Sequence, residues 1–168
     1  MKPPRLFISS LVLAATLLGC GTVLAQEKTP AAPTVSTGTL SEKAREGNAK
    51  ALAELRGRAE KGDADAQNSL GGMYRDGRGV AKDEGEAVKW FRKAADQGDA
   101  DGQSNLGLMY QNGRGVAKDE VEAYKWWLLA GAQGNEHAKK KIPLIERDLT
   151  AAQRLEGQRL AREWKSKK

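Results

Sequence analysis

The chain has 168 residues, of which 39% are hydrophobic and 30% charged, and its formal net charge is +6. This length accommodates one globular domain. One cysteine, Cys20, and one histidine, His137, are present. These exclude an internal disulfide framework and a zinc site of three or four Cys and His ligands, so neither is expected to hold the fold together.

Residues 1–25 have the pattern of a bacterial secretory signal. Lys2 and Arg5 form a short basic segment, followed by an apolar stretch from Leu6 to Leu18 that is too short to span a membrane comfortably. Small residues ending at Ala25 then form a cleavage site. We expect export to the periplasm, with cleavage before Gln26.

A competing processing site lies within the same segment. Leu17-Leu18-Gly19-Cys20 resembles a lipobox, in which Cys20 carries lipid and becomes the mature N-terminus. In that case the protein is anchored in the envelope. Contact with the membrane is expected only if Cys20 is lipidated.

The segment after the signal, residues 26–40, contains two prolines, several Ser and Thr and few apolar residues. This composition predicts a flexible linker. The folded domain is then expected at residues 41–164, and residues 165–168 form a short basic tail.

A 36-residue segment occurs twice in succession, at residues 62–97 and 98–133, with 23 identical positions in a gapless alignment. Self-similarity at this period is typical of solenoid proteins. Stacked repeats make an extended surface rather than a closed catalytic pocket, so the repeat favours binding over catalysis.

Each repeat contains the pattern of two helices joined by a loop. Asp63 is placed to cap a first helix that ends at Asp76-Gly77. A compact loop at residues 77–82 follows, and Asp83-x-x-Glu86 resembles a capping box at the start of a second helix. Apolar residues in that helix recur at helical spacing, so each unit is predicted to be helix, loop, helix.

Glycine and tryptophan at repeated positions indicate the packing of these helices. Gly71 and Gly107 lie inside the first helices, where glycine costs about 1 kcal/mol relative to alanine, so a neighbouring element is expected to approach closely. Trp90 and Trp126 are expected to fill the core.

The segments flanking the repeats also predict helices. Apolar residues at 51, 55 and 59 match the second helix one period later. Downstream, Pro143 is expected to kink or end a divergent helix. Thr150-x-x-Gln153 opens a last amphipathic helix that ends near Trp164.

The repeated pattern closely resembles the Sel-one-like repeat, a relative of the tetratricopeptide repeat with a longer loop between its helices. Gly77-Arg78-Gly79-Val80 and Gly113-Arg114-Gly115-Val116 match the family's loop, and Trp90 and Trp126 match its second-helix tryptophan. The resemblance implies an all-α, right-handed α-solenoid in which the first helices line a concave surface. It also implies an unidentified protein partner.

The sequence contains no complete pattern for catalysis or cofactor binding. The Gly-Arg-Gly loops lack the Lys-Ser/Thr of a phosphate-binding loop and the oxygen ligands of an EF-hand, so their glycines are expected to serve turn geometry. No catalytic residue, cofactor or metal site is assigned.

The sequence favours a non-catalytic interaction module of the bacterial cell envelope. The alternatives are an envelope hydrolase, acting on cell-wall or antibiotic substrates, and a lipid-anchored structural lipoprotein.

Positions that differ between the two first helices suggest where a partner binds. Two sets, each spaced i, i+4, i+7, share a helical face, and stacking would place them side by side. They are Asn68, Gly72 and Arg75 in one copy and Ser104, Leu108 and Gln111 in the next. The alternative is that these positions differ because they are exposed and free to vary.

The positive charge is concentrated at the C-terminal end. From Gly134 onward there are ten Lys or Arg and five Asp or Glu, a net of +5. Nucleic acid is not expected as a partner. Either this end is a solvated basic surface, or it meets anionic lipid or an acidic partner.

Overall fold

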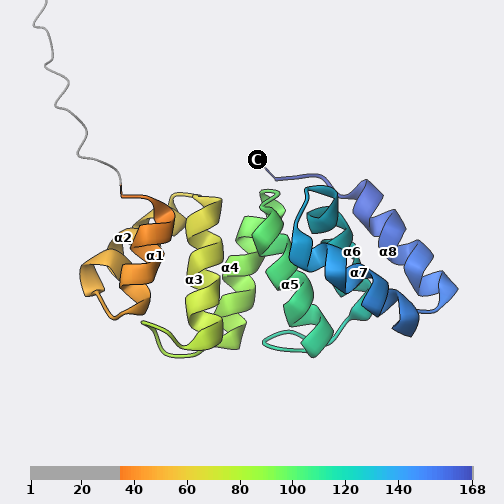
Figure 1. Cartoon of the computed structure of the whole chain (residues 1–168), viewed down its shortest axis with the longest axis horizontal. Helices are drawn as coiled ribbons and strands as arrows, with labels where there is room; N and C mark the ends of the chain where they lie inside the picture. Colours follow the sequence, from red (N-terminus) through yellow and green to blue (C-terminus); the bar gives the residue numbers. More distant parts are fainter. Residues whose placement is uncertain (1–34, 168) are drawn as a thin grey trace, which may run out of the picture. The chain divides into compact units, whose positions relative to one another are not determined.

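The computed structural model describes residues 35–167, which form eight α-helices and no strand (Figure 1). The expected signal segment, Cys20 and most of the expected linker lie outside these residues. The helices are α1 (Thr37–Arg45), α2 (Ala49–Glu60), α3 (Ala64–Asp76), α4 (Glu84–Asp96), α5 (Ala100–Asn112), α6 (Glu120–Ala132), α7 (Glu136–Asp148) and α8 (Ala151–Glu163). The first helix begins at Thr37, so the fold starts before the boundary expected at residue 41.

Each helix begins after a polar residue whose side chain accepts a backbone N–H of the first turn, as predicted for the repeats. Asp63 accepts from Ala66 and Asp83 accepts from Glu86. Thr150 and Gln153 form both halves of a capping box. At Asp83 only one half forms, because the Glu86 carboxylate binds Lys89.

The two repeats form the helical hairpins α3–α4 and α5–α6, which stack on each other through α4 and α5. The internal glycines allow this packing. A Cβ at Gly71 would lie 2.7 Å from the Phe91 ring, and one at Gly107 would lie 2.7 Å from the indole nitrogen of Trp127. The close approach predicted at both glycines is therefore confirmed, and the approaching group is an aromatic side chain of the partner helix.

Two buried glutamines join successive repeats. Gln67 donates to the Ala59 carbonyl at 2.9 Å and accepts from Gln97 at 2.7 Å. One period later, Gln103 donates to the Ala95 carbonyl at 3.2 Å and accepts from Gln133. A buried amide left without partners would destabilise the fold, so these bonds select one stacking register.

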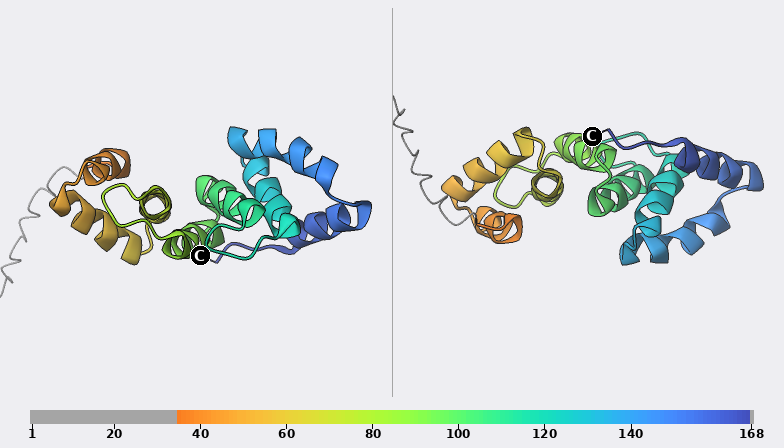
Figure 2. Two further views of the ribbon diagram at one scale, coloured as in Figure 1. Left: turned by 90° about the horizontal axis from the view of Figure 1, so that it is seen from below. Right: turned by 90° about the horizontal axis from the view of Figure 1, so that it is seen from above.

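The last hairpin differs from the two before it. Helices α7 and α8 diverge from their short connection and both pack against α6 (Figure 2). Only Leu149 and Thr150 join them, in place of the loop that joins α3 to α4. Because this connection is short, α8 covers the outer face of α6 instead of completing a third hairpin.

Because α8 covers α6, the two repeat tryptophans are buried to different extents. Trp126 is 2% exposed and meets the edge of Trp164 with ring centroids 6.2 Å apart. Trp90, its equivalent, is only partly buried. Trp90 therefore packs against the core, as expected, but is less buried than Trp126, because among residues 35–167 no helix covers the outer face of α4 as α8 covers α6.

Helix α7 contains Pro143 and continues to Asp148. The proline therefore does not end the helix. Its missing N–H leaves the Lys139 carbonyl without its usual donor, and Lys139 lies on an exposed part of the helix.

Candidate functional site

A polar groove of about 360 Å³ crosses the first helices of the array. Helix α3 contributes residues of its second and last turns, α5 contributes one side, and α7 contributes its N-terminus. The residues that line this polar groove are Asn68, Arg75, Asp101, Ser104, Asn105, Leu108, Asn135 and His137.

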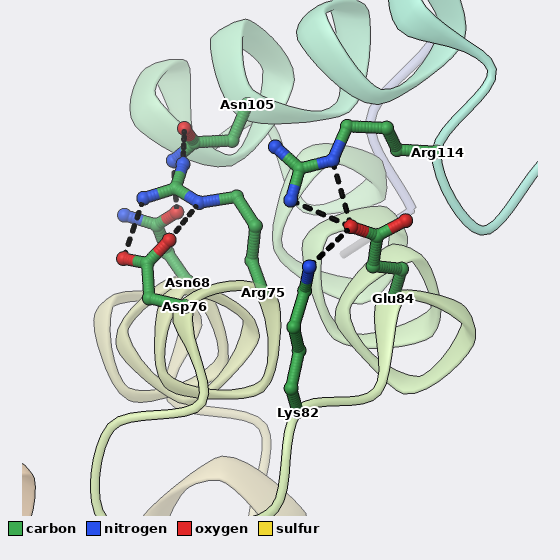
Figure 3. Close-up of polar contacts among 7 residues, drawn as sticks. All are labelled: Asn68, Arg75, Asp76, Lys82, Glu84, Asn105 and Arg114. Carbon is green, nitrogen blue, oxygen red and sulfur yellow. Dashed lines mark hydrogen bonds and ion pairs between the residues drawn. The ribbon is translucent and has the colours of Figure 1, made fainter.

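An amide and guanidinium network joins α3 to α5 along the groove (Figure 3). The Asn105 amide donates to Asn68 Oδ1 at 2.8 Å, and Asn105 Oδ1 accepts from Arg75 at 3.1 Å. Arg75 also makes two hydrogen bonds to Asp76, at 2.7 and 2.9 Å. These bonds hold the side chains in fixed positions on the surface.

The charges of this network stabilise one another. The hydrogen bond from Arg75 lowers the pKa of Asp76 below its ordinary value, and the nearby Arg45 and Arg114 lower it further. The same bond raises the pKa of Arg75. Both groups are therefore charged near neutral pH, and their charges largely offset each other.

Two further contacts join α5 to the start of α7. The Asn135 amide donates to Asp101 Oδ1 at 2.7 Å, and Ser104 Oγ lies 3.0 Å from His137 Nδ1. The pKa of His137 is lowered, first by burial and then by the positive charges of Lys141, Lys140 and Arg75. The imidazole is therefore neutral at pH 7 and can exchange a hydrogen bond with Ser104.

The structure brings together four of the six residues predicted from repeat differences. Asn68, Arg75, Ser104 and Leu108 line the groove. Gly72 is buried, and the Arg45 guanidinium lies over it. Gln111 lies outside the residues that line the groove. A role in binding a partner stays a prediction for all six.

The prediction missed four other residues of the groove, namely Asp101, Asn105, Asn135 and His137. Asn105 also differs between the repeats, since its counterpart in the first copy is Ser69, but it lies outside the i, i+4, i+7 set that defines the predicted face. The side chains on α7 belong to a diverged repeat. Only stacking of α7 on α6 shows that they reach the groove.

A second charged cluster, beside the groove, joins the two repeats through ion pairs (Figure 3). Arg114, in the loop of the second repeat, makes hydrogen bonds of 2.8 and 2.6 Å to Glu84 at the start of α4. Lys82 approaches the same carboxylate at 3.1 Å. The loop glycines beside these residues have positive φ, which confirms their predicted role in turn geometry.

The chemistry of the groove suits recognition. It presents amides, a guanidinium and one leucine, all of which can contact a peptide. The Ser104–His137 pair resembles part of a catalytic triad, but no carboxylate bonds to the other ring nitrogen within residues 35–167.

Residues 35–167 contain no group of three His, Cys, Asp or Glu able to hold a metal ion. Among their helices, none has the length and apolarity to cross a membrane.

Comparisons with known proteins agree with the repeat architecture. The Sel1 repeat model matches residues 64–99 and 100–135. A crystal structure of a Sel1 repeat protein from Oxalobacter formigenes is 42% identical, with a TM-score of 0.58, and the match covers 64% of this chain and 85% of that one. No curated protein matches the chain.

A second crystal structure is that of c5321, described as a protective antigen present in uropathogenic Escherichia coli strains and displaying an SLR fold. It is 31% identical with a TM-score of 0.69, and the match covers 77% of this chain. The chain spans only 30% of that protein's length. Sel1 repeats are in general protein–protein interaction modules, and the predicted all-α, right-handed solenoid is confirmed. The chain belongs to the Sel1 repeat family.

Proposed function

We propose that this protein is a non-catalytic interaction module of the bacterial cell envelope, which is exported to the periplasm and binds an extended segment of a partner protein in the polar groove. One observation carries the proposal. Three successive first-type helices contribute side chains to a single groove, and hydrogen bonds between the helices hold those side chains in place.

The prior ordering of the groove favours binding. The rotamers of Asn68, Arg75 and Asn105 are already held by hydrogen bonds in the free chain. A partner therefore does not have to pay the full entropy of immobilising them. Amide groups can exchange hydrogen bonds with an extended peptide backbone, while Leu108 offers an apolar contact.

The test is crosslinking and co-purification from intact cells, with the exported protein as bait. The groove variant carries Arg75→Glu and Leu108→Asp. Its matched control carries Arg159→Glu and Leu155→Asp, the same changes on α8, where Leu155 is 65% exposed. Circular dichroism melting establishes that both variants fold.

We expect the control to capture the same partner as the unmodified chain and the groove variant to lose it. Equal capture by a folded groove variant would exclude the groove as the binding surface. Loss of capture in the control alone would instead place binding on the basic C-terminal end.

A further inference from the structure

The C-terminal end of the chain binds back onto the helices through a defined set of contacts. We call residues 164–167 the C-terminal strap. Trp164 packs its ring against Trp126. Beyond it, Ser166 Oγ donates to the Gln97 carbonyl at 2.8 Å, and Lys167 reaches Asp96 through both its backbone N–H, at 2.7 Å, and its ammonium, at 2.9 Å.

The site that receives this strap is built from repeat positions. Trp126 belongs to α6, and the other three residues, Asp96, Gln97 and Gly98, end α4. The strap lies directly over Gly98, where a Cβ would be in van der Waals contact with the Ser166 hydroxyl at 3.6 Å and the Trp164 ring at 3.7 Å. We call these four residues the strap site.

Repeat equivalence places a second copy of this site one period earlier. The residues 36 positions before those of the strap site are Glu60, Lys61, Gly62 and Trp90. The essential chemistry is retained, with an acidic side chain at 60, a backbone carbonyl at 61, glycine at 62 and tryptophan at 90. Gly62 has a φ of 98°, close to the 94° of Gly98, so the backbone turns in the same way.

The equivalent site is open within residues 35–167. No atom lies within 4 Å of a Cβ built on Gly62, whereas the strap fills that space at Gly98. In both repeats a lysine ammonium covers one face of the tryptophan, Lys93 at 4.0 Å and Lys125 at 4.4 Å from the ring centroid. The two sites differ in Trp164, because Trp90 has no aromatic partner among the described residues, and in Lys93, whose counterpart in the second repeat is Leu129.

We propose that Glu60, Lys61, Gly62 and Trp90 form a second interaction surface, which binds a peptide segment of a partner protein with the chemistry of the strap: a tryptophan, followed two positions later by serine and three positions later by lysine. The aromatic side chain packs on Trp90, the serine hydroxyl donates to the Lys61 carbonyl, and the lysine pairs with Glu60. The chain's own strap is already seated on the strap site, and we assign the occupant of this second surface to another protein.

The test uses a fluorescently labelled peptide with the sequence of residues 162–168 and the chain from residue 26 onward. Fluorescence anisotropy measures the affinity and calorimetry the stoichiometry. We expect saturable binding of one peptide per chain. Glu60→Lys should weaken it about fivefold, since an exposed attractive pair becomes repulsive, whereas the exposed Glu42→Lys should not change it. A Lys167→Glu peptide should bind Glu60→Lys better than it binds the unmodified chain.

Absence of saturable binding at millimolar peptide would overturn the inference, as would equal effects of Glu60→Lys and Glu42→Lys. Binding that depends on Asp96 but not on Glu60 would mean that the peptide displaces the chain's own strap, and would also overturn it. Leu108→Asp, in the polar groove, should leave peptide binding unchanged. Failure of this surface is therefore distinguishable from failure of the groove.

Discussion

Replacing each repeat tryptophan by alanine should destabilise the protein unequally. Trp126 is 2% exposed, packs against Trp164 and donates its indole N–H to Glu122 at 3.0 Å. A buried tryptophan removes roughly 150–250 Å² from water, which at ~25 cal/mol per Å² corresponds to about 4–6 kcal/mol. Core truncations of this kind cost ~3–5 kcal/mol. Trp90 is only partly buried and lacks an aromatic partner among residues 35–167, so its truncation should cost about 1–2 kcal/mol less.

Urea unfolding followed by far-UV circular dichroism measures both changes, because the helical signal does not depend on the tryptophan that is removed. Trp126→Ala should also lower the melting temperature by about 10 °C or more. A double-mutant cycle with Trp164→Ala should give a coupling of ~0.5–1.5 kcal/mol for Trp126 and none for Trp90. Equal losses of stability for Trp90→Ala and Trp126→Ala would refute the argument that α8 makes the two positions different.

Three other predictions concern separate parts of the chain. Gly115→Ala should destabilise the fold by more than about 2 kcal/mol, since φ is +66° and the new methyl group would overlap the Glu84 carbonyl; Gly134→Ala, with φ of +94° and open space around it, should cost only ~1–2 kcal/mol in thermal melts. The pKa of His137 is lower in the folded chain than in the unfolded chain, so the unfolded chain binds the proton first as the pH falls. The contribution of His137 to the free energy of unfolding is therefore full above pH ~6.5 and is lost as the pH falls below it. Urea titrations at several pH values should show a smaller decline of stability with falling pH for His137→Gln than for the unmodified chain. Mass spectrometry of the exported protein should find a chain that starts at Gln26, whereas a lipidated Cys20 at the N-terminus would contradict cleavage after residue 25.

Much of the fold follows from features that are local in the sequence. Capping residues such as Asp63 and Asp83, and positive-φ glycines in the loops, set where each helix begins and ends, because their effects act within one turn of backbone. The exact period then requires that the two hairpins stack in the same way. Four of the six residues predicted for a partner-binding face consequently line one groove.

Tertiary contacts decided the rest. The repeat pattern assigns Trp90 and Trp126 the same environment, yet only Trp126 is covered, because a two-residue connection sends α8 across α6. A signal for this was present in the second copy, where Leu128 and Leu129 replace Arg92 and Lys93, but its meaning depends on which helix lies above them.

The groove, too, was predictable from local sequence only in part. Its α3 and α5 side chains could be placed from helical spacing, whereas His137 and Asn135 reach it only through the packing of α7 on α6. The seating of the strap on Asp96 and Gln97 joins positions about 70 residues apart. Sequence periodicity determines which faces of a helix are apolar, since that depends on spacing along one chain segment. Which segment covers each face depends on contacts between distant residues, and the free energy of those contacts exists only in the folded chain.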